Sequence, residues 1–178
     1  IDNSPGAGGT IAAKKVMSAP KDGYTVLIHH IGMSTAPGLY KNLGYDPMTD
    51  FEHLGMVADV PMVMVANKDL PAKNLTELLA YIKANGTKVN YANAGIGSAS
   101  HLCGLLFMSA IQQDMTTVPY KGTAPALTDL LGGQVQLMCD QTTNLSGQLK
   151  AGSVKAYGAT TMQRIAAFKD IPTFNEQG

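Results

Sequence analysis

The chain has 178 residues, of which 45% are hydrophobic and 15% charged, and its formal net charge is +0. The neutral balance argues against nucleic-acid binding, because such proteins concentrate basic residues on one face. No run of Lys or Arg indicates attraction to a membrane surface, and no apolar stretch reaches the roughly 18 residues of a membrane-spanning helix. We therefore expect neither a nucleic-acid partner nor direct insertion into a membrane.

The first third of the chain is predicted to contain one helix and several strands. Residues 11–19 follow a glycine-rich turn and predict a helix. β-Branched and apolar residues over 24–31 predict a strand, and the shorter apolar runs 54–57 and 62–66 are typical of buried strands. Small and hydroxyl-bearing residues at 32–37 predict a loop after the first strand.

Beyond residue 67, predicted helices and strands alternate. Asn74 is expected to cap the first of these helices. The expected elements are helix 75–84, strand 88–93, helix 98–112, strand 116–120, helix 124–131, strand 134–139, helix 145–150 and strand 154–159. This alternation predicts an α/β fold with largely parallel sheets. In such sheets, ligands bind beyond the C-terminal ends of the strands.

The segment 89–101 carries the clearest functional signal. A strand-type run passes through Gly95 and Gly97 into the start of a helix. Backbone N–H groups at a helix start are unpaired, and the helix dipole places partial positive charge there, so an anion can be held without a cationic side chain. The expected ligand-binding residues, taken from three loops at the strand ends, are Ser34, Thr35, Gly97, Ser98, Ala99, Ser100, His101 and Asp140.

Asp140 has two interpretations of equal weight. It ends an apolar strand at the expected edge of the sheet, where its carboxylate could bond a ligand hydroxyl or a neighbouring loop. It could equally open an Asx-turn into the following segment. The sequence leaves the two open.

Other chemistries fit these residues less well. The Gly95-x-Gly97-x-x-Ser100 pattern lacks the third glycine, and no acidic residue ends the next strand, so no dinucleotide cofactor is expected. The histidines lack metal-ligand spacing to Cys or carboxylates, so no metal is expected. A serine hydrolase using Ser98 or Ser100 with His101 is the alternative function. The structural alternative is that Ser98 caps the helix and His101 packs in its first turn.

The two cysteines, Cys103 and Cys139, are too few for a disulfide framework. Each lies within an apolar run, and free Cys is among the residue types most often buried. We therefore predict two buried free thiols, and a disulfide between them is the alternative.

Several motifs together resemble one family. They include Val-Pro-Tyr-Lys-Gly-Thr-Ala-Pro-Ala and Gly-x-Gly-Ser-x-x-His-Leu, and they lie at residues 2–9, 20–25, 39–51, 95–102, 118–126, 129–135 and 171–178. The chain resembles the solute-binding proteins of tripartite tricarboxylate transporters, the Bordetella-uptake-gene type. This resemblance implies the two-lobed architecture of type II periplasmic binding proteins, with the ligand cleft between two α/β lobes.

The resemblance also implies a division of the chain and a function. The first lobe would comprise residues 1–67 and 153–178, and the second would comprise 68–152. Family members begin with another strand and loop and continue with further helices, so the chain is expected to be an internal fragment with an incomplete first lobe. The implied function is periplasmic, and it is binding rather than catalysis. The protein would capture a small carboxylate (a dicarboxylate, tricarboxylate, amino acid or aromatic acid) and deliver it to the permease subunits of a membrane transporter.

Overall fold

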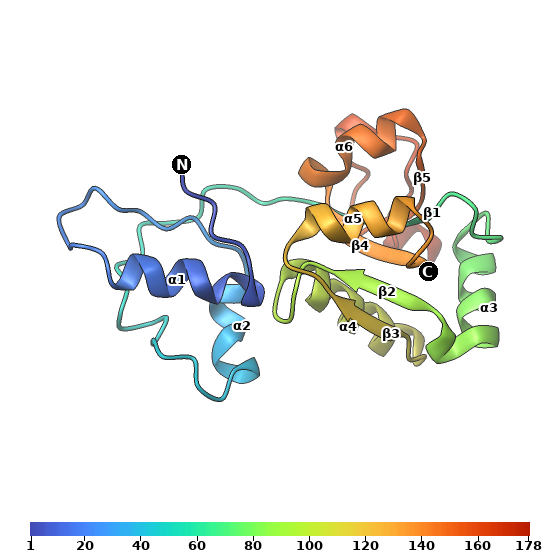
Figure 1. Ribbon diagram of the computed structural model, residues 1–178. Coiled ribbons are helices and arrows are strands. Elements are labelled where there is room, and N and C mark those ends of the chain that lie inside the picture. Colours follow the sequence, from blue (N-terminus) through green and yellow to red (C-terminus); the bar gives the residue numbers. More distant parts are fainter.

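The computed structural model describes all 178 residues, which fall into two parts (Figure 1). The part that precedes residue 61 contains helices α1 (Thr10–Met17) and α2 (Gly32–Leu39), and long segments without regular secondary structure follow each helix. The remainder contains the β-sheet and four further α-helices. The two parts lie side by side, with α1 and α2 at the left in Figure 1.

The sheet has five strands in the order β3-β2-β4-β1-β5. The strands are β1 (Met62–Asn67), β2 (Asn90–Asn93), β3 (Thr116–Pro119), β4 (Leu137–Gln141) and β5 (Val154–Ala159). β2 runs parallel to both β3 and β4, whereas β1 runs antiparallel to both β4 and β5. The C-terminal ends of β2, β3 and β4 therefore meet at one edge of the sheet.

Helices cover both faces of the sheet. They are α3 (Leu75–Asn85), α4 (Ala99–Ile111), α5 (Thr123–Leu131) and α6 (Thr142–Ala151), and short 3₁₀ turns lie at Ala7–Gly9, Gly86–Lys88, Ala166–Phe168 and Asn175–Gln177. A hydrophobic core lies on each face of the sheet. Met64 of β1 belongs to one core, together with Leu78 of α3, and Val63 of β1 belongs to the other, together with Leu130 of α5. This alternation is that of a strand buried on both faces. No helix of the structure is long and apolar enough to cross a membrane.

Most elements after residue 61 agree with the sequence prediction. Asn74 caps α3 as expected, since its side chain accepts a hydrogen bond from the backbone N–H of Glu77 at 2.9 Å. Ser98 caps α4 in the same way. The sheet, however, is mixed rather than largely parallel, because β1 lies antiparallel between β4 and β5.

The predicted strands at 24–31 and 54–57 do not form. Neither segment pairs with another strand, and apolar side chains such as Tyr24, Ile28 and Met56 are exposed. A strand needs a hydrogen-bonded neighbour, and residue type alone cannot supply one. Residues 32–37, predicted as a loop, lie within helix α2.

The expected division into lobes is also wrong. It assigned residues 1–67 and 153–178 to one lobe and 68–152 to the other. β4 pairs with β2 on one side and with β1 on the other, so one sheet runs through both proposed lobes. The structure instead divides the chain just before β1.

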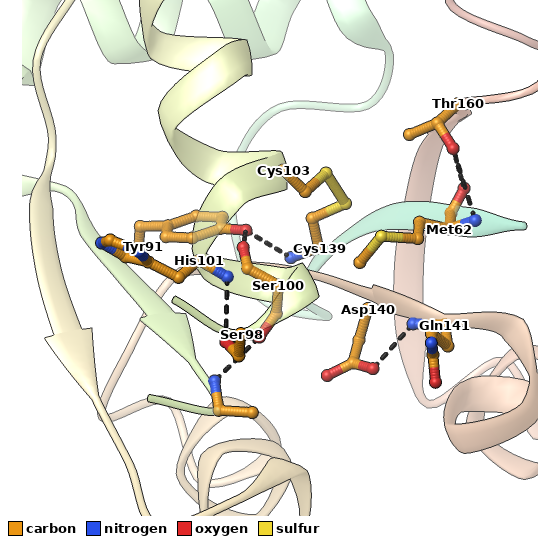
Figure 2. Close-up of a disulfide and its surroundings, with 11 residues drawn as sticks. Met62, Tyr91, Ser98, Ser100, His101, Cys103, Cys139, Asp140, Gln141 and Thr160 are labelled. Carbon is orange, nitrogen blue, oxygen red and sulfur yellow. Dashed lines mark hydrogen bonds between the residues drawn. A yellow bond between two sulfur atoms is a disulfide. The ribbon is translucent and has the colours of Figure 1, made fainter. Parts of the chain in front are cut away.

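The prediction of free thiols is wrong as well. Cys103 on α4 and Cys139 on β4 form a disulfide, drawn in Figure 2. Their Cα atoms are 6.1 Å apart, within the range that a disulfide spans. The two apolar runs that suggested burial are a helix and the strand beneath it, and their packing brings the sulfur atoms together.

Candidate functional site

Three helices begin at the sheet edge where β2, β3 and β4 end. Each of these strands leads directly into a helix, namely α4, α5 and α6. A cavity of about 820 Å³ lies beside these helix starts. Its lining on this side comprises Ala94, Ser98, Ala99, Ser100, Gly122, Thr123, Asp140, Gln141 and Asn144. The opposite wall comes from the N-terminal part, mainly residues 1–9 and 25–30. The cavity therefore lies between the two parts of the molecule.

The turn before α4 is held together by its own hydrogen bonds. The backbone N–H of Ser98 donates to the Gly95 carbonyl at 3.0 Å, and the backbone N–H of Gly97 donates to Nδ1 of His101 at 3.2 Å. The N–H of His101 donates to the Ser98 hydroxyl oxygen at 3.2 Å. The backbone N–H groups of Ala99 and Ser100 donate to no protein acceptor. These two amides are therefore the ones available to an anion in the cavity.

The two buried serine hydroxyls leave one further donor. Oγ of Ser98 and Oγ of Ser100 are 3.0 Å apart, so one hydroxyl donates to the other. Each oxygen also accepts a backbone N–H, Ser98 from His101 and Ser100 from Ala94 at 2.8 Å. One of the two hydroxyl hydrogens is therefore left for a ligand. Figure 2 shows this pair at the start of α4, below Tyr91.

Tyr91 fixes α4 against the sheet. Its buried hydroxyl donates to the Ser100 carbonyl at 2.6 Å and accepts from the backbone N–H of Cys139 at 3.2 Å. The ring lies against Gly104, where a Cβ would approach the ring carbon Cε1 to 2.2 Å. The tyrosine and the nearby disulfide thus join α4 to β4 and hold the helix start in place.

Asp140 ties two helix starts together. Its buried carboxylate accepts from the Thr123 hydroxyl at 2.9 Å, the Asn144 side-chain amide at 2.8 Å and the backbone N–H of Gln141 at 2.7 Å. Burial raises the pKa of Asp140, and these hydrogen bonds oppose that shift. The Asx-turn that was one interpretation of Asp140 does not form, because the backbone N–H of Thr142, two residues on, donates to the Pro61 carbonyl at 2.9 Å. The Asp140 carboxylate lines the cavity instead.

The structure brings only some of the predicted site residues to the cavity. Ser98, Ala99, Ser100 and Asp140 line it, whereas the lining does not include Ser34, Thr35, Gly97 or His101. Ser34 and Thr35 belong to α2, where the Thr35 hydroxyl donates to the Ile31 carbonyl at 3.3 Å.

His101 does not pair with either serine as a general base would. Its Nδ1 accepts from the Gly97 N–H, and no hydrogen bond joins its ring to the hydroxyl of Ser98 or Ser100. Burial lowers the pKa of His101. A nucleophile needs a base within hydrogen-bond reach, so the geometry does not favour the hydrolase alternative. The structure also contains no group of three or more His, Cys, Asp or Glu that could hold a metal ion.

Sequence reasoning missed the opposite wall of the cavity. The glycine-rich turn at residues 6–9 packs against the Gly95–Gly97 turn so closely that a Cβ on Gly8 would lie 2.2 Å from the Ile96 carbonyl oxygen. His29 and His30 also line this wall. From the sequence, both histidines were expected to lie in a paired strand. The glycines at residues 6–9 were the one local signal that another backbone segment would approach closely there.

Comparison with known proteins connects this site to a family. The profile of the family described as "Tripartite tricarboxylate transporter family receptor" matches residues 1–178. The chain belongs to this family. A relative from Agrobacterium vitis, "UPF0065 protein in the TAR-I ttuE-ttuC' intergenic region", is 47% identical over 178 residues, which are 100% of this chain and 51% of that protein. The chain thus spans about half the length of this curated relative.

Solved structures of other members share the fold. The periplasmic binding protein BugD superposes with a TM-score of 0.95 at 53% identity, over 99% of this chain and 59% of that one. MatC from Rhodopseudomonas palustris, solved with bound malate, superposes with a TM-score of 0.90 at 39% identity, and the match covers 97% of this chain and 59% of that one. Rpa4515 from R. palustris, solved with adipate, superposes with a TM-score of 0.95 at 36% identity, and the match covers 100% of this chain and 60% of that one.

These matches confirm the family resemblance and the periplasmic-binding-protein architecture. The family consists of receptors, and the structural neighbours are binding proteins rather than enzymes. The prediction of a binding protein in place of a hydrolase agrees with both findings.

Proposed function

We propose that this protein is a periplasmic receptor that captures a small dicarboxylate and delivers it to the permease subunits of a tripartite transporter. The observation that supports the proposal most is the meeting of three helix starts at one cavity, with two free amides at Ala99 and Ser100. Partial positive charge at a helix start stabilises a carboxylate. The malate and adipate bound by MatC and Rpa4515 are dicarboxylates, which favours this class over other acids.

In this proposal one carboxylate of the ligand lies at the start of α4. It accepts from the amides of Ala99 and Ser100 and from the remaining hydroxyl hydrogen of the Ser98 and Ser100 pair. Gly97 and His101 act indirectly, because their mutual hydrogen bond shapes the turn. Asp140 positions the starts of α5 and α6. Ser34 and Thr35 are left out of this set.

The proposed binding of the ligand carboxylate depends on hydrogen bonds more than on a salt bridge. The cavity lining contains one lysine and no arginine, and the ammonium of Lys15 is paired with the Asp2 carboxylate. A ligand charge would therefore be compensated by backbone dipoles. Hydrogen bonds to a charged group are worth about 1.5–3 kcal/mol each, so several of them can supply micromolar binding.

Calorimetric titration with adipate, and in parallel with malate, tests this proposal. The matched control ligand is adipamide, which has the same chain length but carries no charge. We expect adipate or malate to bind and adipamide to bind at least tenfold more weakly. As a protein control, Ser109→Ala removes an exposed hydroxyl near the other end of α4 and should leave the affinity unchanged. Equal binding of adipate and adipamide, or no binding of either acid, would contradict the proposal.

A further inference from the structure

The Gly95–Gly97 turn, which leads into α4, packs directly against the backbone of the N-terminal part. A Cβ on Gly8 would lie 2.2 Å from the Ile96 carbonyl oxygen, and a Cβ on Gly32 would lie 2.9 Å from the Gly97 carbonyl oxygen. Both approaches are too close for a side chain at either glycine. The turn therefore lies in contact with both the glycine-rich turn at residues 6–9 and the start of α2.

Tyr40, the residue that follows α2, connects the N-terminal part to this turn. Its hydroxyl donates to the Ile96 carbonyl oxygen at 2.7 Å. This is the one direct hydrogen bond between the two parts of the molecule, and no ion pair joins them. The covalent connection runs through residues 54–60, which are mostly exposed and form no hydrogen bond. The arrangement of the two cavity walls therefore depends on this hydrogen bond and on the packing around the turn.

The peptide group between Ile96 and Gly97 is held from both sides. Its carbonyl accepts from Tyr40, and its N–H donates to Nδ1 of His101, in the first turn of α4, at 3.2 Å. Because a peptide group is planar and rigid, a contact that orients its carbonyl also orients its N–H. Tyr40 does not line the cavity, so it can act on a ligand there only through this peptide group. Burial raises the pKa of Tyr40, so the hydroxyl keeps the proton that it donates.

We propose that Tyr40 is a positioning residue, whose hydroxyl holds the Ile96–Gly97 peptide group and thereby directs the free amides of Ala99 and Ser100 into the cavity. Its effect on affinity rests on the function proposed above, whereas its effect on the turn does not. Molecules in which the turn is held this way are the ones competent to bind, and the apparent affinity falls in proportion to their fraction. The loss of one neutral hydrogen bond changes such a fraction by about 3- to 10-fold at most.

The test uses Tyr40→Phe, which keeps the ring and removes only the hydroxyl. Calorimetric titration should show adipate binding about 3- to 10-fold more weakly than to wild type. Tyr24→Phe is the matched control, because this exposed tyrosine lies outside the cavity lining, and it should bind as wild type does. Amide hydrogen exchange without ligand gives a second measurement. The N–H groups of Gly97 and Ser98 should exchange at least about threefold faster in Tyr40→Phe, while the amides of β1 should exchange at the wild-type rate.

The outcomes separate this inference from the function on which it rests. If wild type binds adipate and Tyr40→Phe binds it equally well, the positioning role of Tyr40 is refuted and the proposed function stands. If exchange accelerates in β1 by the same factor as in the turn, Tyr40 contributes only to overall stability, and the positioning role is again refuted. If wild type binds neither adipate nor malate, the proposed function and the role of Tyr40 in binding fall together, whatever the exchange rates.

Discussion

Removing the Cys103–Cys139 disulfide should lower the stability of the sheet-containing part. Cys103→Ala combined with Cys139→Ala leaves α4 held to β4 by packing and by Tyr91. The bond joins residues 36 positions apart. For a loop of this length the chain-entropy relation gives about 4 kcal/mol in the free energy of unfolding. In a chain of this size, that corresponds to a fall in Tm of about 8–16 °C.

Urea denaturation of wild type and the double variant, each with and without reductant, measures this effect. Reductant should destabilise wild type by about the same amount as the double substitution, and it should leave the double variant unchanged. Thiol titration of denatured, unreduced wild type should find no free thiol. Two free thiols in that titration, or a difference below about 1 kcal/mol between oxidised and reduced wild type, would refute the reasoning.

Two further predictions concern α4 and Asp140. Gly104→Ala should destabilise the protein by at least about 1–3 kcal/mol, because its Cβ would overlap the buried ring of Tyr91. Gly147→Ala, in α6 with nothing within 4 Å of the added carbon, should be neutral or should stabilise by about 0.5–1 kcal/mol. Thermal denaturation compares the two, and equal effects would contradict the packing account. For Asp140, the folded-state pKa lies above its ordinary value. The folded protein therefore binds more protons than the unfolded chain just above pH 3.8, and this group makes stability fall as the pH rises through that window. The free energy of unfolding of Asp140→Asn, taken relative to wild type, should therefore increase from pH 3.5 to pH 6 when it is measured by urea titrations. A decrease would show that the hydrogen bonds to Asp140 lower its pKa more than burial raises it.

Features that depend on neighbouring residues were predictable from the sequence. The caps at Asn74 and Ser98 are local hydrogen bonds, so the starts of α3 and α4 follow from residue type and spacing. The alternation after residue 67 likewise predicted the order of helices and strands. It also predicted which edge of the sheet would carry the cavity, because the ends of successive parallel strands share one edge.

Features that depend on distant partners were not predictable. The run 24–31 has the composition of a strand but pairs with none, and composition does not report whether a neighbour exists. The position of β4 between β2 and β1 likewise decides the division of the chain, and no local signal encodes it. The Cys103–Cys139 bond and the hydrogen bond from Tyr40 to Ile96 appear only when separate segments meet in space.

The most direct test of the central claim, that a ligand carboxylate lies at the start of α4, is the affinity of Ala99→Asp for adipate or malate. An aspartate in the first turn of a helix interacts favourably with the helix dipole, so this variant should fold at least as stably as wild type. Its carboxylate would repel the ligand and compete for the free amides. At about 4 Å near a protein surface such repulsion is of the order of 4 kcal/mol.

The matched control is Ala110→Asp, which makes the same change at an exposed residue near the other end of α4, outside the cavity. Calorimetry should show that Ala99→Asp loses at least about 100-fold in affinity, while Ala110→Asp binds as wild type does. If Ala99→Asp binds adipate or malate as tightly as wild type, the carboxylate does not lie at the start of α4 and the account of this site is wrong.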